Sequence, residues 1–163
     1  MKLVVGADHA GFPAKQLVIE TLRERGHEVL DVGTYSEAPV DFPDIARALS
    51  AAVLDGRAER GVLVCGTGIG ASIATNKIRG MRAALAHDIY SAHQSVEHDN
   101  ANVLCLGAQV VGPKVIVDLL DAFMRARWLP DEEFHRRVAK LEELEVAGSA
   151  SGASAPKAGS DAN

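Results

Sequence analysis

The stretch of the chain with the clearest chemical potential is 61–72, in which Cys65 closes an apolar run and three glycines follow within five residues. The run is typical of a buried parallel strand, and the residues after Ala71 favour a helix. A cysteine at the end of a strand is usually a small buried hydrophobe. Here the N–H groups of a glycine turn and of a helix start adjoin it, so the sequence predicts a reactive thiol with a lowered pKa. Cys105 lies within another strand, without such a turn, and is predicted to be core.

The glycines have two functional interpretations. In the first, Gly66, Gly68 and Ala71 fit the G-x-G-x-x-A pattern of a dinucleotide site, with Asp88 about 20 residues later for a ribose hydroxyl. That pattern normally opens the first strand–helix unit, whereas here it follows the third predicted strand. In the second, the amides of the turn hold an oxyanion or a phosphate, which the sequence Cys-Gly-Thr-Gly suits better.

Strands and helices alternate along the chain and position this turn. The apolar patterns predict strands over 2–6, 28–32, 61–65, 81–86 and 102–106, and helices over 13–25, around 45–53, over 71–78, from 113, and around 134–141, with a helix or long loop over 90–99. Short connections between alternating elements predict a parallel sheet covered by helices on both faces. The folded domain is expected to comprise residues 1–145. Residues 146–163 are rich in Gly, Ser and Ala and are predicted to form a disordered tail.

Ligands bind beyond the carboxyl ends of the strands in such sheets. Polar residues follow three of the predicted strands: Asp8 and His9, Cys65 and Thr67, and His87 and Asp88. A second polar group comprises His98, just before the last strand, and 135–137 on the last helix. The residues of this second group are also compatible with an ordinary solvated surface. No function is assigned to His87 or His93.

Composition excludes several classes of function. The formal net charge of −5 argues against nucleic acid or an anionic membrane surface as the main partner, although a small anionic substrate is compatible with it. No run approaches the roughly 18 apolar residues of a membrane span, and the N-terminus lacks a signal-peptide pattern. Two cysteines make no disulfide framework and lie in no zinc-binding spacing, so a reducing cytoplasm is expected.

Three motifs resemble the sugar-phosphate isomerase family that contains the type B ribose-5-phosphate isomerases and the galactose-6-phosphate isomerase subunits. They are 6–11 (GADHAG), 65–77 (CGTGIGASIATNK) and 97–104 (EHDNANVL). The resemblance covers residues 1–145. It implies a Rossmann-like three-layer α/β sandwich with a five-stranded parallel sheet and a C-terminal helix extension. It also implies an aldose–ketose isomerase that needs no metal or cofactor. The enzyme is expected to be a homodimer or homotetramer with its active sites between subunits.

The resemblance also implies roles for individual residues. Cys65 is expected to move a proton between C1 and C2 of the open-chain sugar, and Thr67 to assist through its hydroxyl. His98 and Asp8 are expected to open the sugar ring. The remaining residues are expected to bind substrate: Gly66, Gly68, Ile69 and Gly70 at the enediolate oxygen, His9 and Arg137 at the phosphate, and Asp99 and Arg136 beside them.

Three positions depart from the family pattern. The family commonly has Asn where this chain has Asp99, and Arg where it has Gln109 and Glu133. His135 or Arg136 would compensate for the missing cations from the next turn. The resemblance implies ribose 5-phosphate and ribulose 5-phosphate as the substrates, and the three departures keep a tetrose, hexose or modified pentose phosphate open as the alternative. A nicotinamide-dependent oxidoreductase and a non-catalytic sugar-phosphate-binding subunit are the further alternatives.

Overall fold

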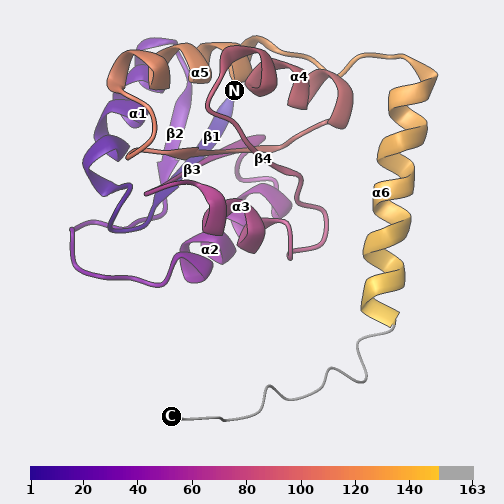
Figure 1. Cartoon of the computed structure of the whole chain (residues 1–163), viewed down its shortest axis with the longest axis horizontal. Helices are drawn as coiled ribbons and strands as arrows, with labels where there is room; N and C mark the ends of the chain where they lie inside the picture. The colour runs from indigo at the N-terminus through magenta and orange to yellow at the C-terminus, as the bar shows by residue number, and fades with distance from the viewer. Residues whose placement is uncertain (151–163) are drawn as a thin grey trace.

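Five parallel strands form one sheet in the computed structural model, which describes residues 1–150, with side chains through residue 147 (Figure 1). The strands lie in the order β2-β1-β3-β5-β4. The elements in chain order are β1 (Lys2–Ala7), α1 (Phe12–Glu24), β2 (Glu28–Asp31), α2 (Phe42–Leu54), β3 (Arg60–Cys65), α3 (Ile69–Thr75), β4 (Ala83–Leu85), α4 (Ile89–Asp99), β5 (Val103–Gly107), α5 (Pro113–Arg125) and α6 (Glu132–Ala150). The predicted three-layer α/β sandwich with a C-terminal helix extension is confirmed.

Alternate residues of the central strands face two separate apolar layers, as the period of two in a strand requires. On one face, Val5, Val62 and Leu104 pack with apolar residues of α1, α4 and α5. On the other face, Leu63 and Cys105 pack with apolar residues of α2 and α3. Cys105 is fully buried, which confirms its predicted place in the core.

The chain changes direction across the sheet between β1 and β3. After β1 it passes to β2 on one side, and it then returns to pair β3 with the other side of β1. The carboxyl ends of β1 and β3 thus flank the switch point where open α/β sheets bind their ligands. Asp8 and Cys65 lie directly at these two ends.

Some predicted boundaries differ from those in the structure. The strand predicted over 81–86 is only Ala83–Leu85, α3 is shorter and earlier than 71–78, and the segment 90–99 is a helix rather than a loop. Helix α6 continues to Ala150, past the predicted boundary at residue 146. The rest of the predicted tail, 151–163, lies outside the described residues.

Helix α6 stands beside the sheet domain and is joined to it by an extended segment after α5 (Figure 1). Its first turns contact α4, and Glu145 Oε2 near its end accepts a hydrogen bond of 3.1 Å from the Gly80 N–H. Over the described part of the chain, no helix is long and apolar enough to cross a membrane.

Candidate active site

The turn after β3 surrounds the Cys65 thiol with backbone N–H groups. Gly68 has φ +78°, in the left-handed region that glycine adopts without strain, and this turns the chain directly into α3. The N–H groups of Gly68 and Thr67 both hydrogen-bond the sulfur. Helix α3 has only seven residues, so these turn amides, rather than a long-helix dipole, are the positive groups beside the thiol.

The pKa of Cys65 is raised, and the lowered value expected from the sequence is wrong. Burial of the thiol is the largest cause, and a hydrogen bond to the Asp8 carboxylate raises the pKa further. The N–H groups of Gly68 and Thr67 lower it, as expected, but do not outweigh these two effects. At neutral pH the unliganded chain therefore holds a protonated thiol that is hydrogen-bonded to the Asp8 carboxylate.

Asp8 is fixed by the loop that follows β1. Its side chain is only 5% exposed, and its Oδ1 accepts a hydrogen bond of 2.8 Å from the Gly11 N–H. Its own N–H donates to the Val64 carbonyl on β3, at 3.1 Å. The loop is thus tied to the strand that carries Cys65, which explains how two residues 57 positions apart in sequence come into contact.

His9 lies on the same edge of the sheet. Its Nδ1 accepts a hydrogen bond of 3.3 Å from the Val40 N–H, in the loop between β2 and α2. A neutral His9 with this partner carries its proton on Nε2, so Nε2 is the ring's donor. An N–H donor beside Asp8 and the glycine turn suits recognition of an anionic substrate group.

The sequence analysis missed a buried cation behind this edge. The Lys15 ammonium is 5% exposed, bonds both Asp31 carboxylate oxygens at 2.9 and 2.7 Å, and donates to the Thr34 carbonyl at 2.6 Å. Thr34 in turn donates to the carbonyl of Ala7, the residue before Asp8. One sequence signal could have revealed it, because Lys15 lies on the apolar face of α1, three and seven residues before the buried Val18 and Leu22.

The structure does not bring His98 and its neighbours to this edge. His98 and Asp99 end α4, just before β5 begins, so they lie at the opposite edge of the sheet, about 15 Å away along a five-residue strand. The His98 ring stacks on Phe134 of α6, with centroids 4.1 Å apart. This contact joins His98 to the helix that carries Arg136 and Arg137.

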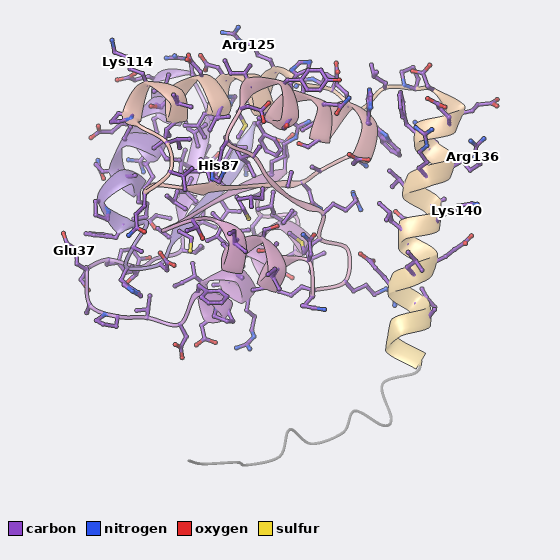
Figure 2. The ribbon with its side chains drawn as sticks, viewed as in Figure 1. Glu37, His87, Lys114, Arg125, Arg136 and Lys140 are labelled. Carbon is purple, nitrogen blue, oxygen red and sulfur yellow. The ribbon has the colours of Figure 1, made fainter. Side chains whose placement is uncertain are left out.

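The cationic residues of α6 are exposed. Arg137 forms an ion pair of 3.3 Å with Glu133, one helical turn earlier, and Arg136 lies on the outer side of the helix (Figure 2). Asp99 lines a cavity of about 330 Å³ between α6 and the sheet domain, with Arg82 and Leu141 among the other lining residues. We call His98, Asp99, Arg136 and Arg137 the α4–α6 cluster, and Asp8, His9 and the Cys65 turn the carboxyl-edge cluster.

Two further residues bear on the alternatives that the sequence left open. The Asp88 carboxylate, expected at a ribose hydroxyl in the dinucleotide interpretation, instead caps α4 by accepting a 2.7 Å hydrogen bond from the Ser91 N–H. Gln109 lies beside the turn, and its N–H donates to the Gly66 carbonyl at 3.0 Å. Because the backbone of residue 109 makes this contact, Gln109 borders the carboxyl-edge cluster, as the Arg that the family commonly has there would.

Sequence comparison places the chain beside known isomerases. Residues 3–141 match the Ribose/Galactose Isomerase family. The ribose-5-phosphate isomerase B of Escherichia coli is 42% identical over 127 residues, which are 78% of this chain and 85% of that protein. The D-erythrulose-4-phosphate isomerase 2 of Mycolicibacterium smegmatis is 44% identical over 115 residues, 69% of this chain and 76% of that protein.

Structural comparison agrees with the sequence. The ribose-5-phosphate isomerase B of Clostridium thermocellum superimposes with a TM-score of 0.88 at 40% sequence identity. The match covers 91% of this chain and 99% of that one, so the similarity includes most of α6 as well as the sheet domain.

Proposed function

Because the chain belongs to the Ribose/Galactose Isomerase family, we propose that it interconverts ribose 5-phosphate and ribulose 5-phosphate by proton transfer through an enediolate. The single observation that carries this proposal is the contact of three groups at the switch point of the sheet. These are the Cys65 thiol, the Asp8 carboxylate and the N–H groups of Thr67 and Gly68. The substrate is the one that the Escherichia coli and Clostridium thermocellum relatives are named for.

The chemistry follows from what each group can do. Proton abstraction next to a carbonyl needs a base and a donor for the oxygen that becomes negative. The Cys65 thiolate, whose own proton has left to solvent, removes the proton from C2 of the open-chain aldose and delivers it to C1, while the proton of the C2 hydroxyl passes through the Thr67 hydroxyl to the C1 oxygen. The amides of residues 66–70 stabilise the enediolate oxygen, and Thr67, whose side chain is exposed, donates its hydroxyl to it.

The raised pKa of the thiol fits this task. A sulfur that is a strong base once deprotonated is better matched to a carbon acid than a strongly acidic thiol would be. The N–H groups of Thr67 and Gly68 lower the thiol pKa and so stabilise the fraction of thiolate that reacts. In the unliganded enzyme the thiol is protonated at neutral pH, which protects the sulfur from adventitious oxidation, because the thiolate is the reactive form.

Ring opening and phosphate binding require the α4–α6 cluster, which lies at the opposite edge of its own sheet. We propose that a second copy of the chain presents its own His98, Arg136 and Arg137 to the carboxyl-edge cluster. Apolar side chains suited to such a contact are exposed on α3 and α6: Ile69, Ile73, Leu141 and Leu144 are between 43% and 68% exposed. The proposed enzyme is a cytoplasmic homodimer or homotetramer with two half-sites in each active site.

An isomerisation assay tests the proposed reaction. The purified full-length chain and the Cys65→Ala variant would each be incubated with ribose 5-phosphate, erythrose 4-phosphate and allose 6-phosphate, and the ketose products followed by NMR, with reactions lacking enzyme as the blank. The proposal predicts that ribose 5-phosphate is converted with the highest kcat/KM. Absence of conversion of every aldose phosphate by the wild-type chain would refute an isomerase, and conversion by Cys65→Ala would remove the thiol from the mechanism.

A four-carbon substrate is the second candidate. The observation in its favour is the 44% identity to the D-erythrulose-4-phosphate isomerase 2 of Mycolicibacterium smegmatis. A higher kcat/KM for the tetrose phosphate in the same assay would favour this substrate and leave the proposed chemistry unchanged.

A further inference from the structure

His87 connects the start of α4 to the end of β5, and neither the fold nor the proposed chemistry accounts for it. The imidazole is half-buried in the loop after β4 (Figure 2). Its Nε2 accepts a hydrogen bond of 3.0 Å from the Gly107 N–H. An imidazole that accepts at Nε2 is neutral and carries its proton on Nδ1. The contact thus uses His87 as an acceptor for the backbone N–H of the last residue of β5.

Gly107 is the point at which β5 touches the Cys65 turn. A Cβ at this position would lie 2.7 Å from the carbonyl carbon and oxygen of Thr67, so only a glycine allows the two backbones to approach so closely. Gly68, in the same turn, also lies close to residues of β4 and β5. A Cβ on Gly68 would lie 2.6 Å from the Leu85 side chain and 2.9 Å from the Leu106 carbonyl carbon.

The two residues after Gly107 bind the turn directly. The Ala108 N–H donates to the Cys65 carbonyl at 2.9 Å, and the Gln109 N–H donates to the Gly66 carbonyl at 3.0 Å. The carbonyls of the turn therefore point toward β5, and its N–H groups point toward the sulfur. A shift of residues 107–109 would be passed to Thr67 and Gly68, whose N–H groups are the ones that bind the sulfur.

We propose that His87 is a positioning residue for the Cys65 turn. It holds the Gly107 N–H, and Gly107 holds the backbone of Thr67 in the orientation that directs the turn amides to the thiol. His87 itself touches neither the sulfur nor, in the proposed chemistry, the reacting carbons. The proposal concerns the geometry of the turn, and only its kinetic consequence rests on the proposed isomerase function.

The test distinguishes the loss of the hydrogen-bond acceptor at Nε2 from the loss of the space that the imidazole ring fills. His87→Gln places an amide oxygen near the position of Nε2 and retains the acceptor, whereas His87→Leu fills similar space without one. His93→Leu is the matched control, because this histidine lies on α4 and contacts the Ala122 carbonyl, away from the turn. If His87→Leu does not fold, His87→Asn replaces it, since its amide is too short to reach the Gly107 N–H.

The first measurement is the rate of Cys65 alkylation by iodoacetamide, monitored by intact-protein mass at a series of pH values above 7. The pH at which the rate reaches half of its maximum is the midpoint. Cys105 is fully buried and serves as the internal reference for a native fold. Because the turn amides lower the thiol pKa, the midpoint is expected to move to higher pH in His87→Leu and to stay near the wild-type value in His87→Gln and His93→Leu. An unchanged midpoint in folded His87→Leu overturns the proposal, as does an equal shift in His87→Gln.

The second measurement is steady-state kinetics on ribose 5-phosphate. Loss of one donor to a developing oxyanion costs about a hundredfold or more in kcat, so a displaced donor is expected to cost about tenfold. We expect this loss in kcat for His87→Leu, with KM little changed and with recovery in His87→Gln. A midpoint shift without loss of kcat would leave the positioning role intact and contradict the part that the turn plays in the proposed reaction.

Discussion

The carboxyl-edge cluster and the α4–α6 cluster differ in how completely one chain builds them. At the carboxyl edge, Asp8 is buried and hydrogen-bonded, and the Cys65 sulfur has three partners within the same chain. In the α4–α6 cluster the cations are exposed, and Arg137 contacts Glu133 and the Phe134 ring, both on its own helix. A base needs fixed geometry before substrate arrives, whereas a phosphate clamp can form when two surfaces meet.

Replacement of the two cysteines gives the largest contrast between the clusters and the core. Cys65→Ala is expected to lower kcat by at least about a thousandfold, because it removes the base from the reaction. Cys105→Ala removes a fully buried side chain on the neighbouring strand and is expected to cost about 1 kcal/mol of unfolding free energy with kcat retained. Kinetics and urea denaturation of both variants measure these effects, and comparable losses of kcat would mean that Cys65 acts through packing.

Lys15 tests how far the carboxyl edge depends on a buried charge pair. Lys15→Met leaves Asp31 without its cation, which costs about 3 kcal/mol when a buried pair is broken. Asp31 is 27% exposed, so solvent limits the loss to this lower end of the usual range. The double variant Lys15→Met/Asp31→Asn is expected to recover part of the stability in urea unfolding. A double variant no more stable than the single one would show that the charge left on Asp31 is not the cause.

Asp8→Asn is expected to change the rate of Cys65 alkylation and the rate of isomerisation in opposite directions. The carboxylate raises the pKa of Cys65, so its neutral replacement is expected to lower the alkylation midpoint and speed alkylation at neutral pH. Isomerisation is expected to fall by about a hundredfold, because the carboxylate expected to take part in opening the sugar ring is lost. The amide oxygen can still accept from the Gly11 N–H, so the loop is retained. Slower alkylation in this variant would contradict the assigned direction of the pKa shift.

Glu133→Gln tests the α4–α6 cluster and is expected to give the smallest change, a modest decrease in KM. Exposed ion pairs contribute at most about 1 kcal/mol, so release of Arg137 is expected to lower KM for a sugar phosphate by no more than about fivefold. Arg137→Ala is expected to raise KM for the same substrate. An unchanged KM in both variants would mean that neither residue takes part in phosphate binding.

The same contrast explains what the sequence could predict. Apolar periodicity and short connections gave the sheet and its layers, because they report burial directly. The glycine spacing identified the Cys65 turn for a similar reason, since it is a local backbone requirement. The direction of the Cys65 pKa shift could not be predicted, because Asp8 and the burial of the thiol come from contacts between different strands.

Other features depended on distant contacts in the same way. Lys15 on the apolar face of α1 is visible in the sequence, but its partners Asp31 and Thr34 are known only from the fold. The bond between His87 and Gly107 spans 20 residues and follows no local pattern. The separation of His98 from Cys65 follows from the parallel strands, because His98 precedes the start of β5 and Cys65 ends β3. The expectation that two subunits share a site came from family resemblance alone.

Complementation between inactive variants is the most direct test of two half-sites on separate copies. Cys65→Ala and His98→Asn would be co-expressed with different tags, and the species that carries both tags would be purified and assayed. Each mixed dimer holds one site with both defects and one with neither, so activity is predicted to rise to about half of the wild-type value. Activity no greater than that of the two separate variants would contradict a site completed by a second copy of the chain.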